Sequence, residues 1–305
     1  MVTLTITAQT GGMNVGTLQI NESIRVGTAS ESVVVLSNLV SLPQQTDSEI
    51  LLIHDPIKGS MVYASDSDVL LVFNGMNWKR ADGQNDSYLI VNIPCVPFAD
   101  SRDGTSYNTV KIGTQCWMAE NLKYLPSVVG PGTDSETDPY YYVYSYDGIV
   151  VAEAKATANY ATYGVLYNWP AAMDGSASSN NNPSGVQGIC PEGWHLPSSA
   201  EWTTLTTYLG GESVAGGKMK EMGTSHWFDP NTNATNESGF TALPGGYRFN
   251  DGAFYEINSG CDWWSATESL SNSVWDRGLE YNNASVYSYS SNKSDGFSVR
   301  CTRDN

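Results

Sequence analysis

The stretch GICPEGWHLPSSAEWTTL at residues 188–205 restricts the fold of this chain more than any other. Ser198 is followed three residues later by Glu201, which is the spacing of a capping box and predicts that a helix begins there. Trp202 and Leu209 recur at helical spacing, so the helix has an apolar face with a large side chain to bury. The stretch therefore requires a sizeable core. An ordinary helix that happens to carry tryptophan is the alternative.

Six blocks of sequence follow one another along the chain in a recognisable order, and one of them contains the start of this helix. They are YNTVKIGTQCWMAENL, YGVLYNWPAAM, CPEGWHLPSSAEW, LPGGYR, WWSATE and GFSVRC. In these blocks the chain resembles the Fibrobacter succinogenes major paralogous domain from about Ser87 to Asn305. The resemblance implies an α+β, C-type-lectin-like fold, related to that of the formylglycine-generating enzymes.

The composition excludes some partners. The chain has 305 residues, of which 15% are charged, and a formal net charge of -17. The electric field of so negative a chain repels phosphate backbones and anionic lipid headgroups, so nucleic acid and membrane surfaces are poor partners. No apolar run reaches the ~20 residues of a membrane span. The start, MVTLTITAQT, lacks the pattern of a signal peptide. We expect an extracellular protein of a bacterial surface or phage virion, which either lost a leader or leaves the cell by another route.

The five cysteines match no zinc pattern. We expect a disulfide between Cys190 and Cys301, and a second one between Cys95 and Cys116, which leaves Cys261 unpaired. The alternative is that all the thiols are buried and reduced.

Residues 1–86 are predicted to form a small β-rich module for attachment or assembly, and residues 87–305 the ligand-binding domain. Val2, Leu4 and Ile6 alternate with threonine as in a strand. The run from Met61 to Trp78 contains two further strands and an Asn-Gly hairpin turn. Because so small a module buries little surface, we expect it to pack against another chain, as in a homo-oligomer, or against the larger domain.

Other elements of the larger domain follow from local patterns. Helices are expected at Met118–Leu122 and Trp169–Met173, and the pair Gly216-Gly217 is expected to break a helix. After Phe240 the pattern consists of strand-length pieces with polar joints.

The sequence offers little for catalysis. Its three histidines have no partner at motif spacing, and His195 is best interpreted as a satisfied core imidazole. The cysteine pair and the histidine cluster of the enzymes related to the family are missing, so catalysis of the formylglycine-generating type is the minor alternative. Neither the acidic turn at Asp100 and Asp103 nor residues 134–138 have the spacing of a calcium loop. We predict no metal and no cofactor.

The segment from Ser271 to Asp295 is rich in Ser, Asn, Tyr and Asp, which are residues that antibody paratopes use. If Val286 faces inward, strand alternation directs Tyr287 and Tyr289 outward. The predicted ligand-binding residues are Asn272, Asp276, Tyr281, Asn282, Asn283, Ser285, Tyr287, Tyr289, Ser291 and Asn292.

This composition also resembles the variable region of diversity-generating retroelement proteins, because changes at the adenines of Asn codons yield Tyr, Ser and Asp. The resemblance implies an adhesin or a phage receptor-binding protein with a protein or glycan ligand. The alternative is an exposed polar hairpin of a structural domain that binds nothing. The Glu-Pro-Asn and Trp-Asn-Asp motifs of calcium-dependent sugar binding are missing from the sequence.

Overall fold

The structure of the chain is a computed structural model. It describes residues 95–303 without interruption and, before them, Thr17–Leu18, Val40–Ser41, Gln44–Gln45, 59–64, 69–73 and 78–80. The chain divides into two compact units at Cys95. The predicted boundary between residues 86 and 87 and the predicted strand at Val2 lie outside the described residues.

The N-terminal unit contains short strands. β1 (Thr17–Leu18) pairs with β2 (Val40–Ser41), and a separate sheet has the order β3-β4-β5-β6, with β3 at Gln44–Gln45, β4 at Met61–Ala64, β5 at Val69–Phe73 and β6 at Trp78–Arg80. β5 and β6 pair antiparallel, with Phe73 opposite Trp78, as a hairpin requires; the predicted Asn-Gly turn itself lies outside the described residues. Val62, Leu71 and Trp78 are buried in this sheet.

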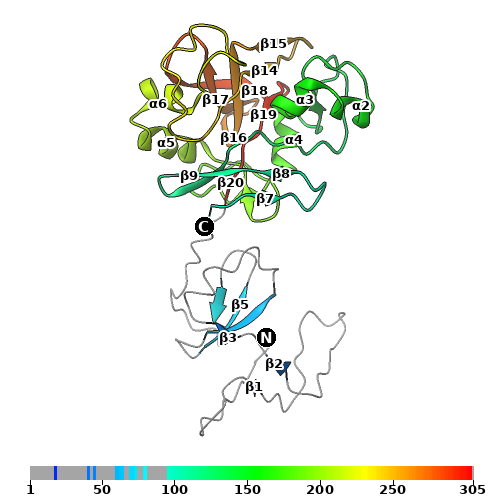
Figure 1. Cartoon of the computed structure of the whole chain (residues 1–305). Helices are drawn as coiled ribbons and strands as arrows, with labels where there is room; N and C mark the ends of the chain where they lie inside the picture. The colour runs from blue at the N-terminus through cyan, green and yellow to red at the C-terminus, as the bar shows by residue number, and fades with distance from the viewer. Residues whose placement is uncertain are drawn as a thin grey trace. The chain divides into compact units, whose positions relative to one another are not determined.

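The C-terminal unit mixes helices and strands, as the α+β prediction requires (Figure 1). Its helices are α2 (Val151–Lys155), α3 (Ala158–Tyr163), α4 (Trp169–Met173), α5 (Ser199–Tyr208) and α6 (Glu212–Met219). Its shorter strands are β7 (Phe98–Ala99), β8 (Ser106–Tyr107), β9 (Thr109–Ile112), β10 (Gln115–Met118), β11 (Tyr141–Tyr142), β12 (Leu166–Tyr167), β13 (Trp194–His195), β14 (Gly245–Arg248), β15 (Phe254–Ile257), β19 (Phe297–Ser298) and β20 (Thr302–Arg303). Its three long strands are β16 (Gly260–Leu270), β17 (Ser273–Glu280) and β18 (Val286–Asn292). None of the helices in the described part of the chain is both long and apolar enough to cross a bilayer.

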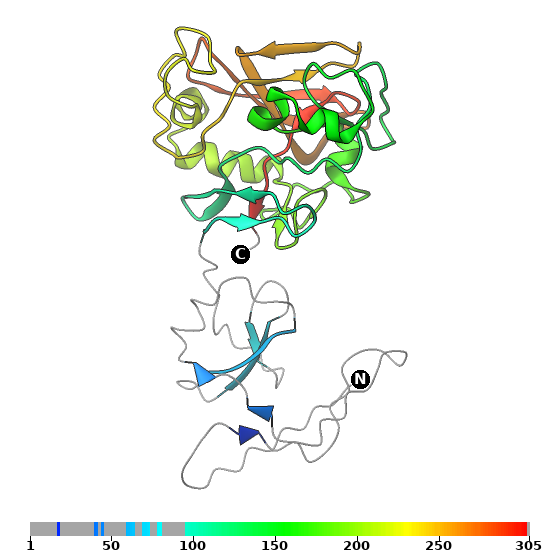
Figure 2. The same cartoon turned by 45° about the vertical axis from the view of Figure 1, so that its right-hand side comes forward.

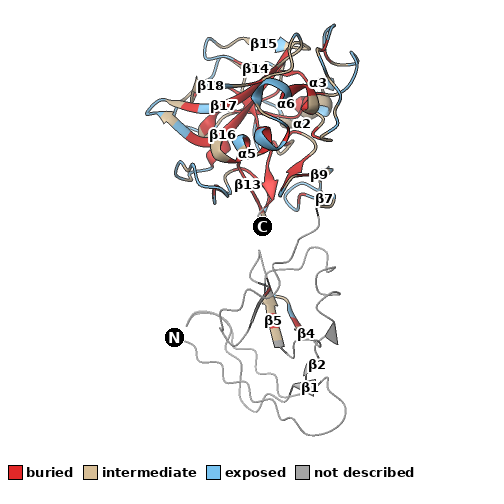
Figure 3. Ribbon diagram, turned by 90° about the vertical axis from the view of Figure 1, so that its left-hand side faces the viewer, coloured by how far each residue is buried: buried red, intermediate tan, exposed pale blue. Residues whose placement is uncertain are grey.

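β16 is the centre of this unit, and both of its faces are buried. Cys261 and Trp263 belong to one apolar core, which α5 and α6 cover. Trp264 and Ala266 belong to a second core on the other face, which includes α4. Figures 1 and 2 show the strands between the green helices and the yellow-green helices, and Figure 3 shows the buried residues concentrated along them. Continuous burial explains why β16 has no polar alternation over its first eight residues.

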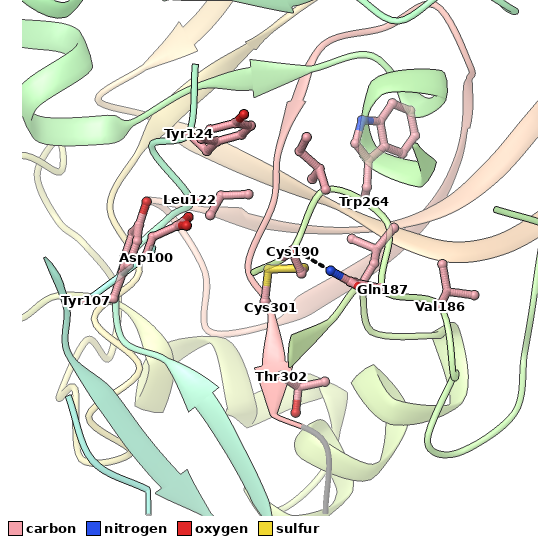
Figure 4. Close-up of a disulfide and its surroundings, with 12 residues drawn as sticks. Asp100, Tyr107, Leu122, Tyr124, Val186, Gln187, Cys190, Trp264, Cys301 and Thr302 are labelled. Carbon is pink, nitrogen blue, oxygen red and sulfur yellow. Dashed lines mark hydrogen bonds between the residues drawn. A yellow bond between two sulfur atoms is a disulfide. The ribbon is translucent and has the colours of Figure 1, made fainter. Parts of the chain in front are cut away.

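The start and the end of the unit are held together by a smaller sheet of order β13-β20-β10-β9. A disulfide joins Cys190 to Cys301 beside β20, and a second one joins Cys95 to Cys116 of β10. Both expected disulfides are therefore present, and Cys261 is the free, buried cysteine among the described residues. Figure 4 shows Cys190–Cys301 between Leu122, Val186 and Trp264.

The predicted start of α5 is confirmed. The Ser198 hydroxyl accepts from the Glu201 amide, and a Glu201 carboxylate oxygen accepts from the Ser198 amide. The other carboxylate oxygen lies 2.7 Å from His195 Nε2, and His195 is buried. The imidazole is therefore a satisfied core group, as predicted.

Two local predictions are wrong. Met118 ends the strand β10, and the residues after it form bends instead of a helix, because Met118 and Leu122 donate backbone hydrogen bonds to the C-terminal segment. Gly216 and Gly217 lie inside α6 instead of breaking it. Gly216 is needed because the backbone of the 281–285 loop approaches: a Cβ there would lie 2.4 Å from the Ser285 carbonyl oxygen. Gly217 is needed because a Cβ there would lie 2.6 Å from the Asn233 carbonyl oxygen.

Candidate ligand-binding face

The candidate site is built on the two-stranded ribbon of β17 and β18, which extends from the edge of β16. Leu279 pairs with Val286, and both side chains are buried on the face covered by α6. Alternation then directs Tyr287 and Tyr289 to the opposite face, as the sequence predicts. Their cross-strand partners on that face are Gly278 and Asp276.

Tyr287 and Tyr289 form a stacked pair, with ring centroids 5.4 Å apart and an interplanar angle of 19°. Tyr289 is 42% exposed, and Tyr287 is partly buried. The Tyr287 hydroxyl accepts from Asn283 Nδ2 at 2.8 Å, and the Tyr289 hydroxyl donates to Glu280 Oε1 at 3.4 Å. Burial raises the pKa of Tyr289, and the neighbouring Glu280 raises it further, so the Tyr289 hydroxyl keeps its proton. We call these two side chains the tyrosine pair.

Neighbouring predicted residues lie at the loop end of the ribbon. Asn283 and Ser285 are partly buried, Asn282 is exposed, and the Asn283 side chain also accepts from the Ser285 amide. A buried lysine fixes this loop, because Lys220 Nζ donates to the carbonyl oxygens of Glu280 at 3.0 Å and Asn283 at 2.8 Å. Burial lowers the pKa of Lys220 to about 8.

The remaining predicted residues are distributed more widely. Asn272 and Asn292 lie at the other end of the ribbon, where Asn292 Nδ2 donates to Glu136 Oε1 at 2.8 Å. Tyr281 is not beside the tyrosine pair, because β17 ends at Glu280 and the Tyr281 ring meets Phe228 at 6.1 Å. The ten residues therefore do not form one continuous surface.

Asp276 contradicts the expectation of an exposed contact residue, because it is 0% exposed. It lies directly opposite Trp264 in the register, on the face of the sheet that adjoins the second core. Strand alternation identifies its face, but the sequence does not say what covers that face. Ser291, which shares this face, is partly buried.

Next to the tyrosine pair is a pocket with a volume of about 190 Å³. Asp276, Tyr289 and Ser291 line it, together with residues that the sequence analysis did not select. These are Tyr247, Phe249, Glu256, Asp262, Gly278, Leu279, Glu280, Asp295 and Phe297. Three of these nine lie on β17, and four others come one each from β14, β15, β16 and β19, whose pairing beside the ribbon depends on contacts distant in sequence. No short motif indicates that arrangement.

The acidic turn considered for calcium is explained by contacts within the protein. Arg102 Nη2 lies 2.6 Å from Asp100 Oδ2, and the Arg102 guanidinium also donates to the carbonyl oxygen of Ile189. Asp103 accepts from the Thr105 amide and lies 3.7 Å from Lys155 Nζ. In the described part of the chain, no three His, Cys, Asp or Glu side chains are grouped to hold a metal ion.

Comparison with known proteins decides the family. The family model described as Fibrobacter succinogenes major domain matches residues 110–303. The chain belongs to this family. The matched part of the Fibrobacter succinogenes major domain extends from β9 to β20, and it contains the ribbon, the tyrosine pair and every residue of the pocket. No curated protein and no solved structure matches the chain.

Proposed function

We propose that the C-terminal unit is a recognition domain that binds a protein or glycan ligand through the tyrosine pair and the adjoining pocket, without transforming the ligand. The observation that carries the proposal is the tyrosine pair itself, a pre-stacked aromatic surface with one ring 42% exposed. Two stacked rings offer a large contact area and lose little side-chain entropy on binding.

The support beneath the tyrosine pair favours this proposal. The ribbon is attached to β16, which is buried on both faces, and Lys220 fixes the loop at its end. Such a site is preorganised, so binding requires little ordering of the protein. Additional aromatic side chains are exposed nearby in the β14–β15 region, where Phe249 and Tyr255 lie 6.2 Å apart between ring centroids.

The test is binding of the full chain to glycan and peptide arrays, followed by the same measurement on Tyr287→Ala and Tyr289→Ala. Each substitution is expected to weaken binding to any array ligand by about tenfold or more, as truncation of an aromatic hot spot does. The melting temperature is expected to fall by less than about 4 °C, because stacking of a partly exposed aromatic pair contributes about 1 kcal/mol.

Tyr208→Ala is the matched control, because Tyr208 is 66% exposed on α5 and lines no part of this pocket. It removes the same atoms and should leave binding unchanged. Binding that survives both changes in the tyrosine pair would refute this site. The absence of any array ligand would favour the alternative of a structural domain.

Further proposals follow from the family resemblance. We propose a C-type-lectin-like fold, which an experimental structure of residues 95–303 would test by superposition. We also propose that the segment from Ser271 to Asp295 is diversified by a retroelement, which requires a near-copy of the gene's 3′ end that differs at adenines. The two disulfides agree with a proposed extracellular location on a bacterial surface or phage virion, because disulfides persist in oxidising compartments. Assembly through residues 1–86 would be seen as an oligomer that a fragment of residues 88–305 does not form.

A further inference from the structure

Three carboxylates are buried together where the pocket meets the sheet. Asp262 on β16, Asp276 on β17 and Asp295 before β19 are 7%, 0% and 2% exposed. Neither carboxylate oxygen of Asp276 has a hydrogen-bond partner, and Oδ1 of Asp295 has none. Ser291 is close enough to lower the pKa of Asp276, but it makes no hydrogen bond of normal geometry with that carboxylate. Buried carboxylates with free acceptor positions are costly, and a bound donor would remove that cost.

The rest of the pocket is aromatic and more open. Phe297 is buried, Tyr247 is partly buried, and Phe249 and Tyr289 are each 42% exposed. Glu256 is exposed and Glu280 partly buried, so negative charge continues toward the entrance. The volume of about 190 Å³ is several times the ~30 Å³ that one water occupies in the liquid.

A glycine on the same face lets two side chains of the pocket lie close to the strand. A Cβ on Gly278 would lie 2.6 Å from Asp262 Oδ1 and 3.0 Å from Tyr289 Cε2. Gly278 has the ordinary extended backbone of β17, so its backbone conformation does not require glycine. What glycine permits here is the close approach of a buried carboxylate and an exposed ring to the backbone of β17, so a side chain at this position would displace both from the pocket wall.

We propose that this pocket receives an organic cation, an ammonium or guanidinium group, that belongs to the ligand bound by the tyrosine pair. The inference thus rests on the proposed function and specifies its ligand. Carboxylates with free oxygens accept charge-assisted hydrogen bonds from such a group. The faces of aromatic rings attract the same group, particularly in a site shielded from water. Rings provide no ligand atoms to a metal ion, which distinguishes this lining from an all-oxygen calcium site.

The ionisation of the pocket is consistent with a missing counter-charge. Burial raises the pKa of Asp276 to about 7 and that of Asp295 to about 6. Burial, followed by repulsion from Asp276, raises the pKa of Asp262 well above its ordinary value. In the free protein, protons therefore neutralise part of the negative charge of these carboxylates. A bound cation would neutralise that charge instead.

The test titrates the full chain with N-acetyl-lysine amide, N-acetyl-arginine amide and the uncharged N-acetyl-norleucine amide at pH 7.5, using calorimetry or NMR. We expect saturable binding of at least one cationic probe and at least about tenfold weaker binding of the norleucine probe. Asp276→Asn should weaken binding of the cationic probe by about tenfold or more, because it removes a charge at nearly constant shape. Glu192→Gln, at an exposed position outside the pocket, is the matched control for overall charge and should change binding by less than about twofold.

Gly278→Ala gives a second, charge-neutral variant if Asp276→Asn fails to fold, and it should also abolish binding of the cationic probe. Equal binding of all three probes, or saturation by Ca²⁺ alone, would overturn the inference. The inference would also be overturned if binding of an array ligand is lost in the variants of the tyrosine pair but is unchanged in Asp276→Asn. The proposed function would then still stand. If the cationic probe binds more tightly than the norleucine probe while Tyr289→Ala leaves binding of the array ligand unchanged, the cation site is upheld and the tyrosine pair is refuted as the binding surface.

Discussion

A buried carboxyl group costs less when it keeps its proton, so Asp276 couples the stability of the domain to pH. Its pKa rises from the ordinary value of 3.8 to about 7, mainly through burial. The folded chain then binds a proton that the unfolded chain releases, and the free energy of unfolding must fall as pH rises from about 4 to about 7. Asp276→Asn should remove this part of the slope, about 2 to 4 kcal/mol across the window.

Urea unfolding at pH 4.5 and pH 8 would measure the effect as a difference between the wild type and the variant. The comparison is needed because other groups around Asp276 also titrate or carry charge: Asp262 on β16, Arg277 and Glu280 on β17, Tyr289 on β18, Asp295 and Glu256. Parallel pH profiles for the two proteins would mean that Asp276 is ionised in the fold.

The same residue gives a second expectation: affinity for a cationic probe should rise between pH 5 and pH 8, because the cation competes with protons.

At the scale of elements, the contact between α6 and the ribbon predicts an unusual response to Gly216→Ala. Alanine normally stabilises a helix relative to glycine by about 1 kcal/mol. Here its Cβ would lie 2.4 Å from the carbonyl oxygen of Ser285 and 2.8 Å from that of Ala284. The net change should be a loss of about 2 kcal/mol or more, because the backbone of the loop must move.

Ser213→Ala is the control in the same helix, because Ser213 is exposed and the change should cost nothing measurable. Chemical unfolding of both variants measures the difference, and binding to an array ligand shows whether the displaced loop disturbs the tyrosine pair. A stable Gly216→Ala variant with normal binding would contradict the proposed support of the loop by α6.

The elements also show which parts of the fold the sequence could predict. Local rules were sufficient for α5, because its capping box lies within four residues, and for the tyrosine pair, because alternation needs only the neighbouring Val286. The same rules misplaced Gly216, because its requirement comes from a loop about seventy residues later. The pocket was not predicted for a similar reason. Its wall on β14 and β15 adjoins the ribbon through the parallel pairing of β14 with β16, which leaves no local pattern.

At the scale of the whole molecule, the two disulfides should contribute differently to the free energy of unfolding, because they close loops of different length. Cys190–Cys301 spans 111 residues, whereas Cys95–Cys116 spans 21. A disulfide restricts the unfolded chain more when it closes a longer loop, by (3/2)RT times the logarithm of the length ratio. Replacing Cys190 and Cys301 by serine should therefore destabilise the protein by about 1.5 kcal/mol more than replacing Cys95 and Cys116.

Both pairs include cysteines buried in the same core, so each double variant serves as the packing control for the other. Equilibrium unfolding of the two variants gives the difference, and equal losses would mean that local packing outweighs loop closure. Alkylation of unfolded, unreduced protein checks the premise: only Cys261 should react, because it is the free cysteine of the described residues. If Cys190 and Cys301 also react, the connection between the start of α5 and the last strand is non-covalent. The ribbon would then depend on non-covalent contacts, the buried faces of β16 and the hydrogen bonds of Lys220, for the rigidity that recognition requires.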